Sequence, residues 1–169
     1  MHETTVEARM FRESARRMRI GDLTINVALT GAGSPALLLH GFPDSLQLWE
    51  AVAPRIAAAG FQVIAPDLRG FGESDAPVGR RQYGIDRLLG DVTGLLRAVD
   101  VQGPVHVVGH DWGAMLAWCL AMSQPALVRS SVVISVGHPR EYALAGLDQK
   151  RKGLYTIGWQ FSGFAERWL

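Results

Sequence analysis

The chain has 169 residues, of which 48% are hydrophobic and 20% are charged, and its formal net charge at pH 7 is +1. This length suffices for one globular domain with a hydrophobic core. A charge this close to zero gives no electrostatic attraction to nucleic acids or acidic membrane surfaces, so no partner of either kind is expected.

Cysteine content and hydropathy bear on the cellular compartment. Cys119 is the one cysteine, so an internal disulfide is excluded, and this favours a reducing environment. No apolar run reaches the length of a membrane span, and the N-terminus lacks the apolar centre of a signal peptide. We therefore expect a cytoplasmic protein, whose oligomeric state the sequence leaves open.

The N-terminal part predicts a hairpin followed by a buried strand. Residues 1–17 mix arginine with glutamate, which indicates a polar, solvated lead-in. Two short extended runs flank Gly21-Asp22, a pattern typical of a β-hairpin. The apolar run Ala36–Leu39 is too short for a helix, so we expect a strand buried on both faces. This strand ends in His40-Gly41-Phe42-Pro43.

Helices and strands then alternate. Residues 45–59 predict a helix that Gly60 ends, and residues 61–65 predict a second buried strand. Apolar residues at helical spacing predict a further helix from Ile85 to Val99, and residues 132–136 predict a last short strand. Alternation of this kind implies a mostly parallel sheet with helices on both faces, an α/β fold.

The most informative stretch runs from Val105 to Met115. It predicts a strand, a sharp turn between Gly109 and Gly113, and a helix, the arrangement of a nucleophile elbow. At such a turn a Cβ on either glycine would meet neighbouring backbone, and the central residue is held in a strained conformation. The central residue here is Asp111, and a carboxylate attacks an electrophilic carbon without first losing a proton. The alternative is that Asp111 only caps an ordinary helix.

The candidate residues share one edge of the predicted sheet. His40-Gly41-Phe42-Pro43, Asp67, Asp111 and His138-Pro139 each follow a strand. Ligands of open parallel sheets bind at the carboxyl ends of the strands, so this edge is the expected site.

With these motifs the chain resembles the α/β-hydrolase fold family, in its epoxide hydrolase and haloalkane dehalogenase branch. G-H-D-W-G at residues 109–113 is similar to the epoxide hydrolase form of the elbow, and H-G-F-P at residues 40–43 is similar to the oxyanion-hole motif. The resemblance implies that the backbone N–H groups of Phe42 and Trp112 stabilise an oxyanion. It also places Tyr155, five residues before Gln160, at the start of a helical cap, where a tyrosine binds the epoxide oxygen.

The resemblance implies a two-step reaction on a small apolar epoxide and water. Asp111 opens the ring and forms an alkyl ester, while Tyr155 donates a hydrogen bond to the ring oxygen. Water then cleaves the ester through a tetrahedral oxyanion. His40 is expected to support the oxyanion turn, and Trp112 to form a pocket wall. No cofactor is expected, and no metal either, since the histidines lack the spacing of metal ligands.

The chain departs from the family after the elbow. The hydrolytic step needs an acid and a histidine base after the nucleophile, and no residue beyond Asp111 supplies that pair, since His138 comes too soon. We therefore expect the N-terminal portion of a longer hydrolase, truncated after the start of the cap. The expected parts are a lead-in over 1–17, the core over 18–139 and the beginning of the cap over 140–169.

Two alternatives remain. A haloalkane dehalogenase shares the aspartate elbow, but Phe42 and Tyr155 argue against it, because that chemistry stabilises halide with N–H donors. A non-catalytic interaction module would keep the fold without the base. The nucleotide sequence downstream distinguishes the enzyme from the module by the presence of the acid and the histidine.

Overall fold

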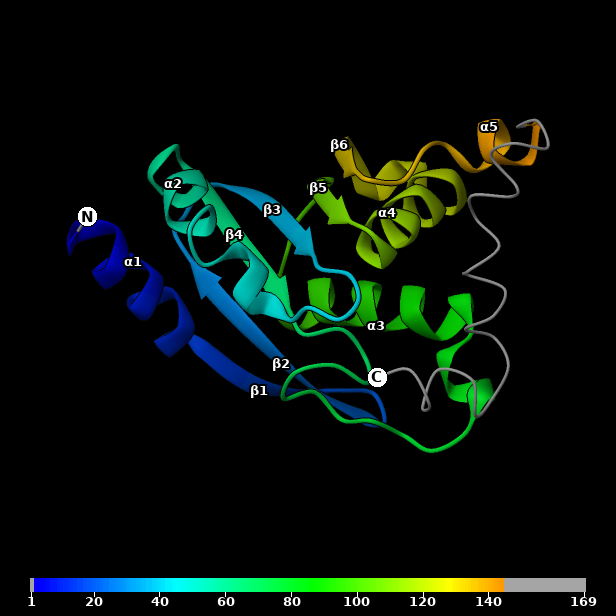
Figure 1. The fold of residues 1–169 in the computed structure, drawn as a ribbon, viewed down its shortest axis with the longest axis horizontal. Helices are drawn as coiled ribbons and strands as arrows, with labels where there is room; N and C mark the ends of the chain where they lie inside the picture. The colour runs from blue at the N-terminus through cyan, green and yellow to red at the C-terminus, as the bar shows by residue number, and fades with distance from the viewer. Residues whose placement is uncertain (1, 145–169) are drawn as a thin grey trace. The chain divides into compact units, whose positions relative to one another are not determined.

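The computed structural model describes residues 2–144, and over these residues the chain forms a six-stranded sheet in the order β1-β2-β4-β3-β5-β6 (Figure 1). Strand β2 pairs antiparallel with both β1 and β4, whereas β4, β3, β5 and β6 run parallel. This confirms the expected mostly parallel sheet. The strands are β1 (Ala15–Ile20), β2 (Leu23–Thr30), β3 (Ser34–Leu39), β4 (Phe61–Pro66), β5 (Val105–His110) and β6 (Val128–Ile134).

Helices cover both faces of this sheet. The described α-helices are α1 (His2–Glu13), α2 (Ala53–Ala58), α3 (Ile85–Ala98), α4 (Trp112–Ser123) and α5 (Pro139–Leu144). Three 3₁₀ turns, η1 (Leu46–Trp49), η2 (Arg80–Tyr83) and η3 (Pro125–Leu127), complete the elements in the described range. Helices α3 and α4 lie over one face, and α1, η1 and α2 lie over the other (Figure 1).

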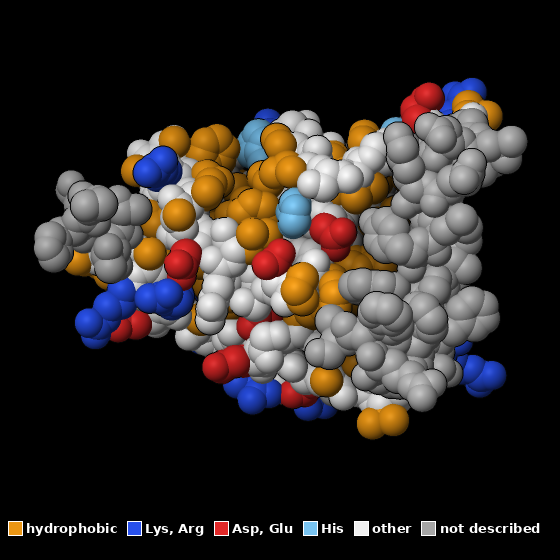
Figure 2. All heavy atoms as spheres, viewed as in Figure 1, with side chains coloured by type: hydrophobic (Ala, Val, Ile, Leu, Met, Phe, Trp, Pro, Cys, Tyr) orange, Lys and Arg blue, Asp and Glu red, His pale blue; other side chains and the backbone are white. Residues whose placement is uncertain are grey.

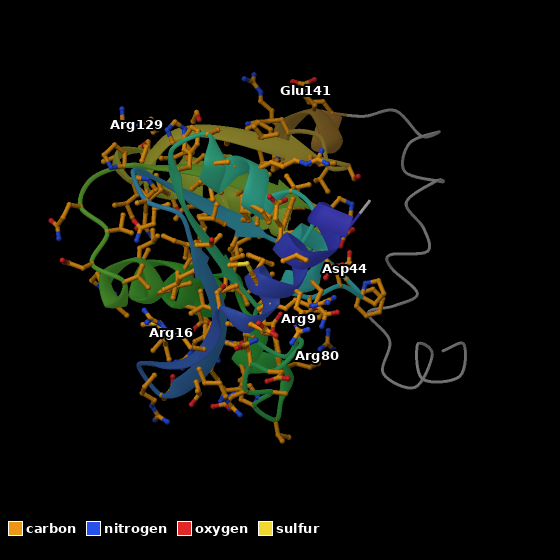
Figure 3. The ribbon with its side chains drawn as sticks, turned by 90° about the vertical axis from the view of Figure 1, so that its left-hand side faces the viewer. Arg9, Arg16, Asp44, Arg80, Arg129 and Glu141 are labelled. Carbon is orange, nitrogen blue, oxygen red and sulfur yellow. The ribbon has the colours of Figure 1, made fainter. Side chains whose placement is uncertain are left out.

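The alternation of side chains along each strand builds two hydrophobic clusters. In β3, Leu37 and Leu39 pack toward α3 and α4, whereas Leu38 packs toward Trp49 of η1. All three leucines of β3 are fully buried, as the apolar run predicted. Figure 3 shows the edge strands at opposite sides of the sheet, with Arg16 labelled on β1 and Arg129 on β6.

The predicted hairpin is confirmed. Strands β1 and β2 pair in register from Ala15 with Ala28 to Ile20 with Leu23. Gly21 occupies the turn with φ of +62°, a conformation that costs glycine little because it has no Cβ.

The polar lead-in expected over residues 1–17 is mostly exposed from residue 6 onward, as expected, but it has regular structure and one buried side chain. Residues 2–13 form helix α1, and β1 begins at Ala15. Phe11 is only 2% exposed and packs with Leu38 and Trp49 in the core cluster under α1 and α2. Polar and charged residues dominate α1, so Phe11 was not part of a recognisable apolar stripe at helical spacing.

Two predicted boundaries also differ. The helix expected over residues 45–59 is split into η1 and α2, because Pro54 lacks an N–H donor and occupies the first turn of a new helix. The last strand begins at Val128, four residues before the predicted start, and ends at Ile134. Residues 129–131 of this strand are polar and exposed, so they carried no buried-strand pattern.

The chain divides into two units between Val136 and Gly137. The cap expected over residues 140–169 stays a prediction, because residues 145–169, with Tyr155 among them, lie outside the described residues.

Candidate active site

The strand-to-helix turn at Asp111 is the predicted elbow. Strand β5 ends at His110, α4 begins at Trp112, and Asp111 between them has φ of +51° and ψ of −117°. A non-glycine residue with positive φ is uncommon, and one in this region stores strain that the surrounding structure must hold in place. The Asp111 N–H donates to the Ile134 carbonyl at 3.2 Å, and its carbonyl accepts from Met115 at 3.1 Å.

The two glycines of the turn sit where a side chain has no room. A Cβ on Gly109 would overlap the carbonyl of Gly113, and a Cβ on Gly113 would overlap the carbonyl of Leu39 on β3. The turn therefore packs directly on backbone, which confirms the expected reason for glycine at both positions.

The Asp111 side chain points away from its own helix. It makes no capping hydrogen bond to α4, although aspartate is a preferred cap. Its Oδ1 instead accepts from the Phe42 backbone N–H at 3.0 Å, across the sheet edge from β5 to the loop after β3. A residue that served only as a helix cap would have its carboxylate on the helix amides, so this geometry excludes the capping alternative.

Gly41 makes room for that contact. A Cβ on Gly41 would lie 2.6 Å from Oδ1 of Asp111 and 2.8 Å from the His110 carbonyl oxygen. Pro43 follows, joined to Phe42 by a cis peptide bond. The His40-Gly41-Phe42-Pro43 turn and the Asp111 elbow are thus brought into direct contact.

His40 lies beneath the turn and is fully buried. Its Nδ1 is 2.9 Å from the Gly41 carbonyl oxygen, and its Nε2 accepts from the Leu68 N–H at 2.9 Å. Burial away from water lowers the pKa of His40 below its ordinary value, because the charged form is the one that loses hydration.

Asp67, after β4, holds several segments together. Its carboxylate accepts from the backbone of Leu46 at 2.7 Å and of Glu73 at 3.0 Å, and from the Asn26 side chain at 2.8 Å. The bond from Glu73 lies within the loop that follows β4, so Asp67 helps to hold this loop. The bonds to Leu46 and Asn26 come from distant parts of the chain, and no local pattern indicated them. Asp75 accepts from the Thr24 backbone at 2.8 Å and from Arg17 at 2.7 Å.

A buried ion pair beside this loop was not predicted from the sequence. The guanidinium of Arg69 donates two hydrogen bonds to the Asp91 carboxylate, at 2.7 and 2.6 Å, and both side chains are largely buried. Asp91 lies on the face of α3 that the apolar spacing assigned to the core, and a charge at such a position is the signal that would have found the pair.

Trp112 and the remaining described histidines have contacts of their own. The Trp112 side chain is 60% exposed, and its predicted oxyanion role concerns its backbone N–H in the first turn of α4. His106 pairs with the Ser130 hydroxyl at 2.8 Å, and the His138 ring accepts from the Arg140 N–H. Nδ1 of His110 lies 3.8 Å from the Asp44 carboxylate, a proximity that the sequence did not indicate.

On the face in Figure 2, a histidine and acidic side chains lie among hydrophobic ones near the middle, and basic side chains lie mostly toward the margins. Asp44 is labelled in Figure 3, on the loop between β3 and η1.

Across residues 2–144, no group of three or more His, Cys, Asp or Glu side chains is arranged to hold a metal ion. None of the described helices has the length and apolar character to cross a membrane.

Known proteins share this architecture. Epoxide hydrolase 1 of Siraitia grosvenorii is 39% identical over 149 residues, which cover 85% of this chain and 47% of the relative. Human epoxide hydrolase 4 is 38% identical over 144 residues, which cover 83% of this chain and 39% of the relative. The crystal structure of an epoxide hydrolase from Vigna radiata is similar with a TM-score of 0.79 and 33% identity, covering 90% of this chain and 52% of that one.

The chain thus spans less than half the length of these curated relatives. The family model described as the alpha/beta hydrolase fold matches residues 35–167, a range that contains both the turn at Phe42 and the elbow at Asp111. With this match and the sheet described above, the chain belongs to the α/β-hydrolase fold family.

Proposed function

We propose that this protein acts on epoxides, and that Asp111 is the nucleophile that opens the ring and becomes an alkyl ester. The observation that carries the proposal is the placement of Asp111. Its backbone has positive φ at the elbow, and its carboxylate makes no bond to its own helix but accepts from the Phe42 N–H at 3.0 Å. The names of the relatives, which are epoxide hydrolases, support the choice of substrate class.

The chemistry follows from the carboxylate. One oxygen of Asp111 attacks a ring carbon, the C–O bond of the epoxide breaks, and the electron pair stays on the ring oxygen as an alkoxide. The proposed donor to this alkoxide is the phenol of Tyr155, which supplies a hydrogen bond and then the proton. A carboxylate nucleophile attacks carbon directly, so it does not need the general base that a serine hydroxyl requires.

The backbone donors serve the second step. When water adds to the ester carbonyl, a negative charge develops on an oxygen of Asp111 itself. The Phe42 N–H already reaches Oδ1 of this carboxylate, and the N–H of Trp112 in the first turn of α4 is the proposed second donor. Small uncharged epoxides and water are the proposed reactants, with no nucleic acid or membrane partner.

Mass spectrometry tests the first step. The purified protein is incubated with an aryl epoxide, and we expect a mass increase of one epoxide per chain, located at Asp111. Asp111→Asn should abolish the adduct. Asp100→Asn is the matched control, since Asp100 is another aspartate with positive φ, 54°, but lies exposed in a turn after α3. An adduct that persists in Asp111→Asn would refute the proposal.

Two further measurements define the chemistry. A haloalkane of similar size, offered in place of the epoxide, should alkylate Asp111 more slowly, and faster alkylation would favour a dehalogenase. Where a single turnover is completed in ¹⁸O-labelled water, the label should enter the Asp111 side chain, because water attacks the ester carbonyl. Label in the diol alone would mean that water attacks the epoxide directly.

A further inference from the structure

We propose that His40 is a positioning residue that aims the Phe42 N–H at Asp111 by holding the Gly41–Phe42 peptide, and that it does so as the neutral tautomer protonated at Nδ1. The inference rests on the proposed function, because it concerns the oxyanion donor of the same reaction.

The hydrogen bonds of His40 define this tautomer. A carbonyl oxygen only accepts, so the 2.9 Å contact between Nδ1 and the Gly41 oxygen requires a proton on Nδ1. A backbone N–H only donates, so the 2.9 Å contact from Leu68 requires a lone pair on Nε2. The neutral Nδ1–H imidazole satisfies both contacts. The Nε2–H tautomer satisfies neither, and the imidazolium loses the bond to Leu68.

The ring holds the peptide that carries the donor. The carbonyl of Gly41 and the N–H of Phe42 belong to one planar peptide unit, in which they point in opposite directions. His40 binds the carbonyl side at 2.9 Å, and Asp111 Oδ1 accepts from the N–H side at 3.0 Å. Rotation of this peptide plane would break both bonds together. A donor on the carbonyl also polarises the N–H of the same unit and strengthens its bond to the carboxylate.

The ring itself is held from the loop after β4. Phe71 packs edge-on against His40, with ring centroids 5.4 Å apart, and also against Phe42 at 6.3 Å. The N–H of Phe71 donates to the carbonyl of Leu68 at 2.9 Å, so the residues that contact His40 form one turn. The Asp67 carboxylate and the Arg69–Asp91 pair anchor this turn to neighbouring segments. The position of the oxyanion donor thus depends on a loop about 28 residues further along the chain.

The surroundings keep the ring neutral. The charged groups that act on His40 are Asp67 and Asp44, and both favour the protonated form. Burial opposes them more strongly, and the pKa of His40 lies below its ordinary value as a result. A second ring proton would also face the Leu68 N–H, where no acceptor is available to it.

Nuclear magnetic resonance of the ¹⁵N-labelled protein tests the tautomer without any substrate. We expect His40 to show a protonated Nδ1, an unprotonated Nε2 and a coupling across the hydrogen bond from the Leu68 nitrogen to Nε2. These signals should stay unchanged from about pH 8 to about pH 6, a range in which an exposed histidine titrates. A ring protonated at Nε2, or at both nitrogens, in this range would overturn the inference.

Two substitutions then separate the two contacts. In His40→Asn, the side-chain amide lies near the position of Nδ1 and keeps a donor for Gly41. In His40→Gln, the longer amide reaches toward Leu68 and leaves the Gly41 carbonyl without its donor. His106→Gln is the control for loss of a histidine, since the His106 side chain bonds Ser130 and packs against Phe61.

Hydrogen exchange of the Phe42 amide and the rate of Asp111 alkylation are the readouts. We expect His40→Gln to lose protection at Phe42 and to slow alkylation about tenfold, because the carboxylate loses the bond that orients it. His40→Asn should remain within about threefold of wild type. Equal rates and equal Phe42 protection in both variants would overturn the inference. If wild type forms no adduct, the proposed function fails, and the tautomer and the Phe42 exchange still test His40. If His40→Gln does not fold, the wild-type tautomer and His40→Asn decide the matter.

Discussion

Removal of the charge from Asp91 should destabilise the fold strongly, because it leaves the Arg69 guanidinium buried without its counter-ion. The two side chains are 2% and 12% exposed and share two charge-assisted hydrogen bonds of 2.7 and 2.6 Å. Breaking one partner of such a pair costs about 3 to 5 kcal/mol. Asp91→Asn keeps the shape and one acceptor, so we expect a loss near the lower end, about 3 kcal/mol.

Another buried nitrogen of Arg69 makes the loss of Asp91 more costly for the stability of the fold. Nη1 of Arg69 is buried and has no hydrogen-bond partner among the residues that the structure describes. Without Asp91, the positive charge has no compensation beyond what the remaining amide oxygen supplies. For a chain of this length, about 3 kcal/mol corresponds to a fall in Tm of about 6 to 12 °C.

Urea unfolding followed by circular dichroism measures the effect. Glu13→Gln is the control, since the Arg9–Glu13 pair is 74% and 59% exposed and an exposed pair contributes less than about 1 kcal/mol. The double variant Arg69→Met/Asp91→Leu should be much milder than Asp91→Asn, because it removes both charges and fills the space with apolar atoms. The reasoning is refuted if Asp91→Asn is as mild as Glu13→Gln, or if the double variant is worse than Asp91→Asn.

Three further outcomes are expected. Gly41→Ala should slow alkylation of Asp111 by at least about tenfold, because the new Cβ would lie 2.6 Å from Oδ1. Gly84→Ala is the control in the same mass assay, since the space around its Cβ position is open. Stability should fall as the pH drops below about 6.5, because the unfolded chain then takes up a proton that buried, neutral His40 does not. The slope contributed by this histidine is at most about 1.4 kcal/mol per pH unit, and urea midpoints of wild type and His40→Asn between about pH 7 and pH 5 should show a shallower dependence in the variant. Tyr155→Phe should slow ester formation by about 10²-fold and change cleavage of the preformed ester much less, whereas equal losses in single-turnover measurements of both steps would mean that Tyr155 only shapes the site.

The amino-acid sequence by itself determined the local elements whose signals are contained in a few residues. The buried run of β3, the hairpin around Gly21 and the elbow between Gly109 and Gly113 were predicted because sheet burial, positive φ and close backbone approach each restrict the residues at those positions. The alternation of strands with helices led to the parallel sheet, and the motifs around Phe42 and Asp111 led to the family that the comparisons confirm.

The tertiary structure decided which side chains meet across distant segments. That Phe11 enters the core and that Arg69 pairs with Asp91 could not be predicted from the sequence, and the contact between Asp111 and the Phe42 N–H was implied by the family resemblance alone. Each of these contacts joins residues far apart in the chain, and its energy depends on burial that exists only after the sheet has formed. Local patterns specify which conformations a segment favours, whereas a buried polar contact is selected by the partners that the completed fold places beside it.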